Sequence, residues 1–271
     1  RFGLPKWRFT NSGTEATMHA VRGARAYTGR TKIVKIEGGY HGSSDTFEAS
    51  VEPDMAKVGD INNPIAVSDS KGVPKETVEQ VIIVPFNNIE VTRRLIENNR
   101  DDIAAFIIEP IMGSAGMLEP SAEYLAFIRD ITKTYGIVLI FDEVGTVRLT
   151  TGGAQQYNGI SPDMTCLGKI IGGGIPIGAF GGKEDIMKMY DPTVKMMYHS
   201  GTFNGNAISM AAGVAALKAY GEKEVNHVNR LGELFRSECN RVFAEVGIDI
   251  WVNGVGSLSN IIFSNNQITE Y

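Results

Sequence analysis

Short β-branched apolar runs alternate along most of this chain with longer segments of helical periodicity. Six runs are predicted strands, at residues 32–37, 80–84, 103–109, 137–142, 164–167 and 179–182, and a strand-like segment opens the chain. Helices are predicted at residues 14–27, 90–98, 122–135 and 208–220. Because parallel strands need crossover connections, this alternation predicts an α/β fold: a mostly parallel sheet with helices on both faces.

The helix predicted at residues 14–27 has the clearest pattern. Ser12 and Glu15 have the spacing of a capping box at its start. The residues that recur on one of its faces are Ala16, Ala20, Gly23, Ala24 and Tyr27.

A change of pattern near Glu222 predicts a second domain. Residues 222–246 have an amphipathic helical pattern, and residues 248–263 predict short strands broken by Gly254 and Gly256. The two predicted domains are a large one, residues 1–221, and the start of a small α+β one, residues 222–271.

Two other segments bear on the organisation of the chain. Residues 52–73 have little periodicity and several Asp, Asn, Gly and Pro residues, so we expect a long loop, of the kind that is often functional.

The sequence begins with Arg1 rather than Met and runs almost at once into a strand-like segment. We therefore expect that an N-terminal segment, with any targeting signal, is missing.

The composition argues against several kinds of partner. The 271 residues include 26 Lys and Arg against 31 Asp and Glu, a net charge of -5, and no basic block suits a nucleic acid. The longest apolar tract, residues 170–182, is short and contains six glycines and Pro176, so we expect no membrane span. Cys166 and Cys239 make no disulfide framework, which favours a cytoplasmic protein.

Residues 11–16, Asn-Ser-Gly-Thr-Glu-Ala, connect the opening strand to the first helix. A helix N-terminus presents free N–H groups and the positive end of the helix dipole, so Ser12, Gly13 and Thr14 suit a phosphate group. Considered alone, the segment is better explained as a capped helix without a ligand.

The turn after the strand at residues 32–37 is Gly-Gly-Tyr-His-Gly, at residues 38–42. Its glycines allow a close approach of the backbone, and Tyr40 offers a flat face for a planar heteroaromatic ring. A glycine turn with a half-buried tyrosine is an equal explanation. For His41 we favour a histidine that holds the turn over an acid or base.

Two apolar strands end in carboxylates, at Glu109 and at Asp142. Such a group must be solvated, paired or hydrogen-bonded, because burying it alone is costly. Asp142 could hold a proton on a ring nitrogen, while Val144, two residues later, could pack against the ring. A metal site or a glycosidase pair is the alternative. No histidine or third acid at ligand spacing supports a metal.

Lys169 follows the strand at residues 164–167 and precedes three glycines. The order Gly168-Lys169 does not fit a phosphate-binding P-loop, which argues against a nucleotide. Most lysines are solvated surface charges, but the apolar neighbours lead us to expect a partly desolvated amine with a lowered pKa, suited to nucleophilic attack. Residues 199–204 form another turn suited to an oxyanion, or a loop capped by Asn206.

Together these turns and strand ends describe a site for pyridoxal 5'-phosphate (PLP). This cofactor needs a phosphate cradle, a ring sandwich, a partner for its pyridine nitrogen and an amine for a Schiff base. The phosphate turn, Tyr40, Asp142 and Lys169 supply one of each.

The same segments resemble those of class III PLP-dependent aminotransferases. They are Asn-Ser-Gly-Thr-Glu-Ala at 11–16, Gly-Gly-Tyr-His-Gly at 38–42, Glu-Pro at 109–110, Asp-Glu-Val at 142–144, Leu-Gly-Lys-Ile-Ile-Gly-Gly-Gly at 167–174 and Ser-Gly-Thr at 200–202. The resemblance covers nearly the whole chain and implies PLP-dependent transferase fold type I. Within the family the chain is most similar to the branch of glutamate-1-semialdehyde aminomutase and β-amino-acid (β-phenylalanine) transaminases.

The resemblance implies a role for each matching residue. Lys169 would hold the cofactor through a Schiff base, Asp142 would pair with its pyridine nitrogen, and Tyr40 and Val144 would enclose its ring. The phosphate would lie on Ser12, Gly13 and Thr14, with His41 and Glu109 beside the cofactor. Thr202 would reach the cofactor phosphate of the neighbouring subunit, because the family builds its active site at a homodimer interface.

The resemblance also implies the reaction. We expect an aminotransferase that moves an amino group from an amino acid or amine, with a β-amino acid favoured, to a keto acid. The partners would then be a small-molecule donor and a keto-acid acceptor. Glutamate-1-semialdehyde 2,1-aminomutase is the alternative, although Ser114 and the position of Arg148 depart from its pattern. A non-catalytic PLP-binding protein is the second alternative.

Overall fold

The computed structural model describes residues 1–269 and 271, and its core is a seven-stranded sheet. The strands are β1 (Lys6–Thr10), β2 (Lys32–Ile36), β5 (Val81–Val84), β6 (Ile103–Ile108), β7 (Val138–Asp142), β8 (Met164–Leu167) and β9 (Gly178–Gly182). Their order is β1-β9-β8-β7-β6-β2-β5. The strands from β8 to β5 run parallel, whereas β9 and β1 pair antiparallel. The prediction of a mostly parallel sheet is confirmed.

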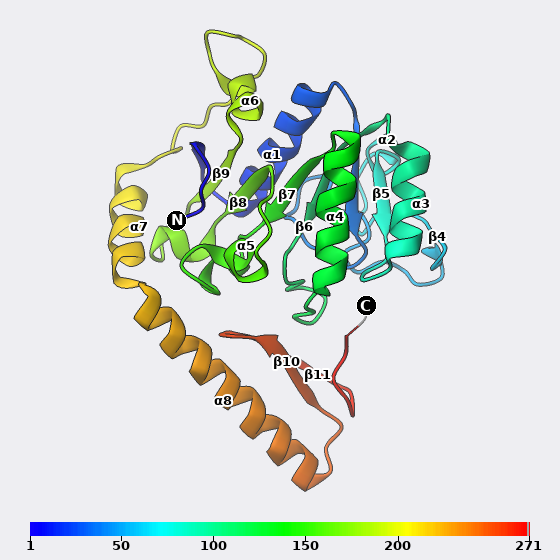
Figure 1. Ribbon diagram of the computed structural model, residues 1–271, viewed down its shortest axis with the longest axis vertical. Coiled ribbons are helices and arrows are strands. Elements are labelled where there is room, and N and C mark those ends of the chain that lie inside the picture. Colours follow the sequence, from blue (N-terminus) through cyan, green and yellow to red (C-terminus); the bar gives the residue numbers. More distant parts are fainter. Residues whose placement is uncertain (270) are drawn as a thin grey trace.

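Helices cover both faces of this sheet (Figure 1). They are α1 (Gly13–Thr28), α2 (Lys75–Val78), α3 (Ile89–Asn99), α4 (Ala122–Tyr135), α5 (Gly153–Asn158), α6 (Glu184–Met187) and α7 (Ala207–Ala219). Successive strand residues face opposite sides, so in β2 Ile33 packs with α1 and Val34 packs with α3 and α4. The six predicted strands and four predicted helices are all present, with ends within one residue of the prediction.

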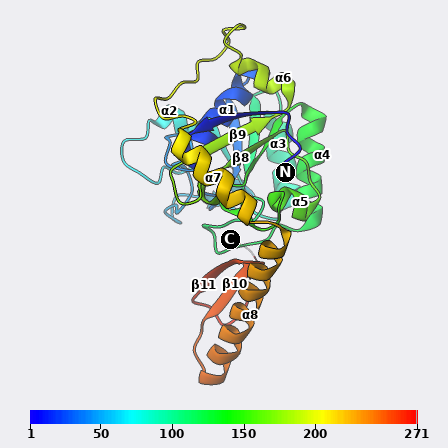
Figure 2. The ribbon, with the colours of Figure 1, turned by 90° about the vertical axis from the view of Figure 1, so that its left-hand side faces the viewer.

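The C-terminal part extends away from the large sheet (Figures 1 and 2). Helix α8 (Glu222–Val246) leads into an antiparallel hairpin of β10 (Trp251–Val255) and β11 (Leu258–Ile262). Gly256 lies in the turn, but Gly254 is inside β10 rather than at a break. A side chain at Gly254 would collide with the β11 backbone, so glycine permits the pairing there. The division into two domains at this helix stays a prediction.

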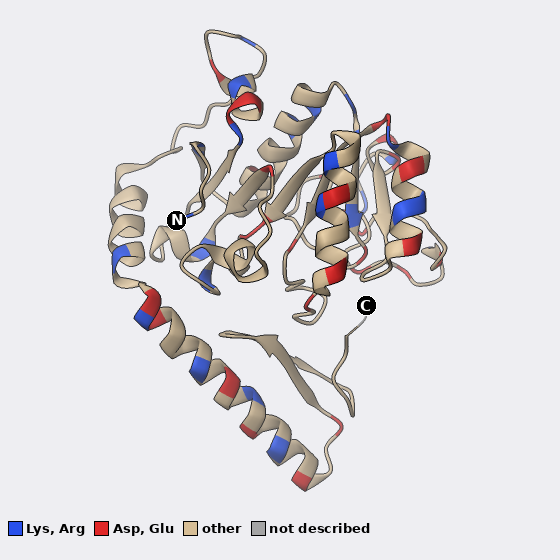
Figure 3. Ribbon diagram, viewed as in Figure 1, with Lys and Arg blue, Asp and Glu red and all other residues tan. Residues whose placement is uncertain are grey.

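Basic and acidic residues, blue and red in Figure 3, are interspersed along α3, α4 and α8. On α8, Arg241 pairs with Glu238 and with Glu245, three and four residues away. These helices therefore present solvated faces. Within the described residues, no helix is long and apolar enough to cross a membrane.

The segment at residues 52–73, expected to be a loop, contains a short hairpin. Its strands are β3 (Gly59–Asp60) and β4 (Asn63–Pro64). The Asp60 side chain accepts the Asn62 N–H at 2.8 Å and closes the turn. Two-residue strands show no hydrophobic period, and for that reason the sequence pattern does not predict them.

Lys35 is a fully buried cation in β2. Its Nζ donates hydrogen bonds to the carbonyl oxygens of Ala49 and Ser50, which fixes the chain after the Gly-Gly-Tyr-His-Gly turn. Burial lowers the pKa of Lys35 to about 8, although nearby carboxylates, Asp69 foremost, oppose this shift.

This burial predicts that the free energy of unfolding rises with pH between about pH 8 and 10.5. There the unfolded chain still binds a proton on Lys35 that the folded protein has released, so raising the pH favours folding, by roughly 3 kcal/mol in total. In denaturant titrations across this window, Lys35→Met should lose that rise, and Lys71→Met, at an exposed lysine, should keep it. Equal slopes for wild type and Lys35→Met would contradict the prediction.

Candidate active site

The N-terminus of α1 packs closely against the ends of β7 and β8. Ser12 caps the helix with a side chain that accepts the Glu15 N–H at 3.2 Å. Glu15 accepts the Asn11 N–H at 2.9 Å, so the reciprocal bond is made one residue before the cap. The N–H groups of Gly13 and Thr14 lie in the first turn, where a helix has no acceptor for them, and they are suited to an anion.

Two glycines allow this close packing around Val144. A Cβ at Gly13 would lie 2.9 Å from both Val144 methyl groups, and one at Gly168 would lie 3.1 Å from the nearer methyl. The contact at Gly13 is closer than real Cβ atoms approach, and the contact at Gly168 is tighter than most. Glycine at both positions therefore lets the three segments meet.

Asp142 ends β7 and is only 5% exposed. Its Oδ2 accepts a hydrogen bond from Nδ1 of the buried His41 at 2.9 Å, and its Oδ1 accepts the Val144 N–H at 3.1 Å. Burial lowers the pKa of His41, although the hydrogen bond to Asp142 opposes this shift. His41 thus holds the Asp142 carboxylate in place, a contact that the sequence does not predict.

Glu109 follows β6 and anchors the turn that carries Tyr40. Its Oε2 accepts the Tyr40 N–H at 3.1 Å, and its Oε1 accepts the Gly113 N–H at 3.2 Å. Burial, and then the charge of Asp142, raise the pKa of Glu109 to about 8. Glu109 therefore favours its neutral form at neutral pH more than an ordinary glutamate does.

Lys169 begins a 3-10 turn, Lys169–Gly172, directly after β8 and Gly168. Its φ of 49° lies in the left-handed region, which costs a residue with a side chain about 1–2 kcal/mol. Its Nζ lies 3.6 Å from the place that a Cβ would take at Gly145, after β7. The side chain is exposed, which corrects the expectation of a partly desolvated amine. The neighbouring Leu167 and Ile171 are buried, but they do not cover the amine.

A cavity of about 210 Å³ brings most of the predicted residues together. Its lining includes Gly13, Thr14, Tyr40, His41, Glu109, Asp142, Val144 and Lys169. A second cavity of about 430 Å³ shares five of the lining residues, Lys169 among them, so the two form one cleft. The amine, the carboxylate, the flat Tyr40 side chain and the helix N-terminus therefore face the same space.

Two predicted residues lie outside this cavity. Ser12 lines a more open cleft that Lys169 also borders. Thr202 is exposed on the loop before α7 and lines neither of the two cavities. Asn206 caps α7, as predicted, by accepting the Ile208 N–H.

Glu143, next to Asp142, has a different task. It is fully buried and accepts hydrogen bonds from the Thr146 hydroxyl and from the N–H groups of Ala154 and Gln155. Burial raises the pKa of Glu143 to about 7, while these bonds oppose the shift. Glu143 therefore connects the turn after β7 to α5 through these hydrogen bonds. Among the described residues, no group of three or more His, Cys, Asp or Glu is placed to hold a metal ion.

The larger cavity has an apolar wall that the sequence does not predict. Its apolar side chains are Ile111, Met117, Val144, Ile170 and Leu258. Leu258 comes from the C-terminal hairpin, and no local pattern signals that contact. Arg148 and Ser114, noted from the sequence only as departures from the aminomutase pattern, also line this cavity.

Comparisons with known proteins identify the family of this chain. The family model "Aminotransferase class-III" matches residues 2–270. A glutamate-1-semialdehyde 2,1-aminomutase of Methanosphaera stadtmanae is 42% identical over 265 residues, which are 97% of this chain and 60% of the relative. The chain thus spans about 60% of the length of such relatives.

Solved structures of transaminases have the same fold. An omega-transaminase from Sphaerobacter thermophilus superposes with a TM-score of 0.93 at 43% identity, covering 97% of this chain and 60% of the other. A β-phenylalanine aminotransferase from Variovorax paradoxus superposes with a TM-score of 0.83 at 35% identity, covering 98% and 57%. The expected fold type I architecture is confirmed.

The pairing of His41 with Asp142 predicts a measurable loss of stability in a His41→Ala variant. The change leaves a buried carboxylate without its partner, so the free energy of unfolding should fall by roughly 2–4 kcal/mol. His227→Ala, at an exposed histidine on α8, is the matched control and should change it little. Chemical denaturation measures both, and equal stabilities would contradict the assigned role of His41.

Proposed function

The chain belongs to the class III aminotransferase family, and from that premise we propose that it acts as a PLP-dependent aminotransferase. Its donor would be an amino acid or amine, with a β-amino acid favoured, and its acceptor a keto acid. Class III aminotransferases depend on PLP. The likeness to a β-phenylalanine aminotransferase supports the choice of donor.

The residues present fit this cofactor. Gly42 lies so close to Thr14 that a Cβ at Gly42 would be 2.4 Å from Thr14 Oγ1. The N–H groups of the first turn of α1, next to this contact, lie at the positive end of the helix dipole. The carboxylate of Asp142 is oriented before any ligand arrives, by two hydrogen bonds. Tyr40 and Val144 line the same cavity from two different turns. A planar, phosphorylated aromatic aldehyde would meet a matching group at each of its functional positions.

The observation that carries the proposal is the convergence of Lys169 and Asp142 on one cavity. They lie 27 positions apart in the sequence, at the ends of the adjacent strands β8 and β7. A strand-end amine next to a buried carboxylate supplies the two chemical groups that PLP needs from a protein besides its phosphate site.

Each residue has a defined task in this mechanism. PLP, when bound, supplies an electron sink for charge that develops on the substrate carbon. Lys169 would hold the cofactor and, once free, would move a proton at Nζ to and from the substrate carbon. Asp142 would keep a proton on the ring nitrogen, with His41 fixing the carboxylate. Gly13 and Thr14 would bind the phosphate, and Glu109 would orient Tyr40 through its N–H.

The aminomutase is the second candidate, because relatives with that name are 42% identical to this chain. Such an enzyme returns the amino group to the molecule that supplied it. It would use the same Lys169 and Asp142, but it would need no separate acceptor. Ser114, Met117 and Arg148 line the larger cavity, and there the two activities would differ in substrate fit.

A homodimer and a cytoplasmic location belong to this proposal as well. Thr202 is exposed beside α7 and is free to reach a neighbouring subunit's phosphate site. Cys166 and Cys239 are free thiols, in keeping with a reducing compartment.

Replacing Lys169 should abolish activity and cofactor attachment together. In the Lys169→Ala variant incubated with PLP, the absorbance of the lysine-bound cofactor and amine transfer from β-phenylalanine to 2-oxoglutarate should both disappear. Lys188→Ala, at an exposed lysine on the surface, should keep both. Turnover by Lys169→Ala would refute the proposal, and binding of PLP by wild type without turnover of any amine would favour the non-catalytic alternative.

The same assay separates the two enzymatic candidates. An aminotransferase should release at most one equivalent of keto product per site until 2-oxoglutarate or pyruvate is added. Isomerisation of glutamate 1-semialdehyde with no acceptor present would instead establish the aminomutase.

A further inference from the structure

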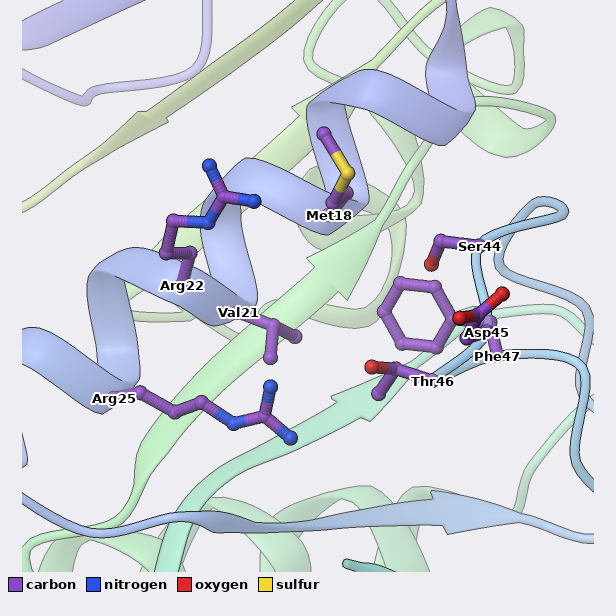
Figure 4. A pocket seen from close by; sticks show the side chains of 8 residues that line it. All are labelled: Met18, Val21, Arg22, Arg25, Ser44, Asp45, Thr46 and Phe47. Carbon is purple, nitrogen blue, oxygen red and sulfur yellow. The ribbon is translucent and has the colours of Figure 1, made fainter. Parts of the chain in front are cut away.

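A separate cavity, of about 360 Å³, lies between α1 and the segment at residues 44–47 (Figure 4). Its lining residues are Met18, Val21, Arg22 and Arg25 of α1, and Ser44, Asp45, Thr46 and Phe47 of the segment. None of them lines the cleft of Lys169 and Asp142. The proposed transaminase chemistry makes no use of this cavity.

Two guanidinium groups give this cavity a positive charge. Figure 4 shows Arg22 and Arg25 projecting from successive turns of α1 along one side of it. Burial, and then the charge of Arg22, lower the pKa of Arg25, so the two cations disfavour one another. In the described part of the chain, neither arginine forms an ion pair with a carboxylate.

Asp45 and the Thr31 carbonyl are the other charged and polar groups near the two arginines. Asp45 is the one acid in the lining, and in Figure 4 its carboxylate lies beyond the Phe47 ring from both guanidinium groups. The Arg25 Nε donates to the Thr31 carbonyl at 2.8 Å, which fixes the side chain. The two terminal nitrogens of Arg25 remain available to donate hydrogen bonds to a ligand.

Ser44 adds a polar group without a partner. Its hydroxyl oxygen is shielded from solvent and forms no hydrogen bond in the structure. A buried hydroxyl in that state is costly unless a ligand or water satisfies it. The Thr46 hydroxyl lines the same space. Two arginines with two hydroxyls are a donor set that matches phosphoryl or carboxylate oxygens.

The remaining surface of the cavity is apolar. Val21 and Phe47 are buried, and Met18 is partly buried beside them. They offer a small aromatic or aliphatic group a place to pack. A site with this lining selects an anion with a compact apolar body over a bare inorganic ion.

We propose that this cavity is a second ligand site, which binds a small organic anion through Arg22, Arg25 and Ser44. Its head group is a phosphoryl or carboxylate group, and its body packs against Val21 and Phe47. The Phe47 ring also packs edge-on against His41, with ring centroids 5.5 Å apart. A bound anion therefore lies one side chain away from the His41–Asp142 pair while leaving the cofactor cleft open.

The test uses the protein saturated with PLP, so that the cofactor's own phosphate site is filled. Phenyl phosphate and benzoate are titrated separately by calorimetry, with benzyl alcohol as the uncharged probe. At least one of the two anions should bind with one equivalent per chain, more weakly as salt is added, and without changing the cofactor absorbance. Which of them binds more tightly identifies the head group. Benzyl alcohol should not bind measurably.

Variants locate the binding. Arg22→Gln should weaken the affinity for the bound anion at least fivefold, because Arg22 is exposed and its loss removes a charged donor without disturbing the core. Ser44→Ala, which removes only the unpartnered hydroxyl, should weaken it at least twofold and keeps the test valid should the arginine variant fail to fold. Arg230→Gln, at an exposed arginine on α8, makes the same change of charge elsewhere and should bind as wild type does.

Three results would overturn the site. They are no binding of either anion to the PLP-saturated protein, unchanged affinity in both Arg22→Gln and Ser44→Ala, and an equal loss in Arg230→Gln. None of these results depends on transaminase activity. The tests of this site and of the proposed function can therefore fail independently.

Discussion

The hydrogen bond between His41 and the Asp142 carboxylate, 2.9 Å long and almost out of contact with water, ties together the two halves of the cleft. A strand that ends in a carboxylate within an apolar sheet needs such a partner, because an unpaired buried charge would destabilise the fold. The partner comes from 101 positions earlier in the chain, on the turn after β2. That turn also carries Tyr40, so the bond that stabilises the carboxylate also brings the aromatic side chain to it.

The sheet order explains why the other groups arrive at the same place. Strands β8, β7, β6 and β2 are parallel neighbours, and their carboxyl ends meet at one edge of the sheet. Lys169, Asp142, Glu109 and the pair Tyr40 and His41 lie at or just after the ends of these four strands, in the same order. Open α/β sheets bind ligands along this edge for the same reason. Burial of Glu109 beside Asp142 then favours a neutral Glu109.

Sequence reasoning captures the parts of this site that depend on local pattern. Apolar runs bounded by glycine and acidic residues locate the strand ends to within one residue, and the ends are where Asp142 and Lys169 lie. It misses what depends on side-chain direction or distant contact. The buried neighbours of Lys169 suggested a covered amine, but they face the interior while the lysine points to the open cleft. Likewise, the helical period of α1 identifies its buried face but not the segment that lies opposite Arg22 and Arg25.

The central claim is that Lys169 is the single lysine of this chain that holds PLP, opposite a carboxylate fixed before the cofactor binds. The most direct measurement is to incubate the protein with PLP, reduce it with borohydride, digest it and locate the cofactor by peptide mass spectrometry. The account predicts one modified peptide, the one that contains Lys169, at close to one equivalent per chain. A label on another lysine, or a label spread over several exposed lysines with none at Lys169, would contradict it.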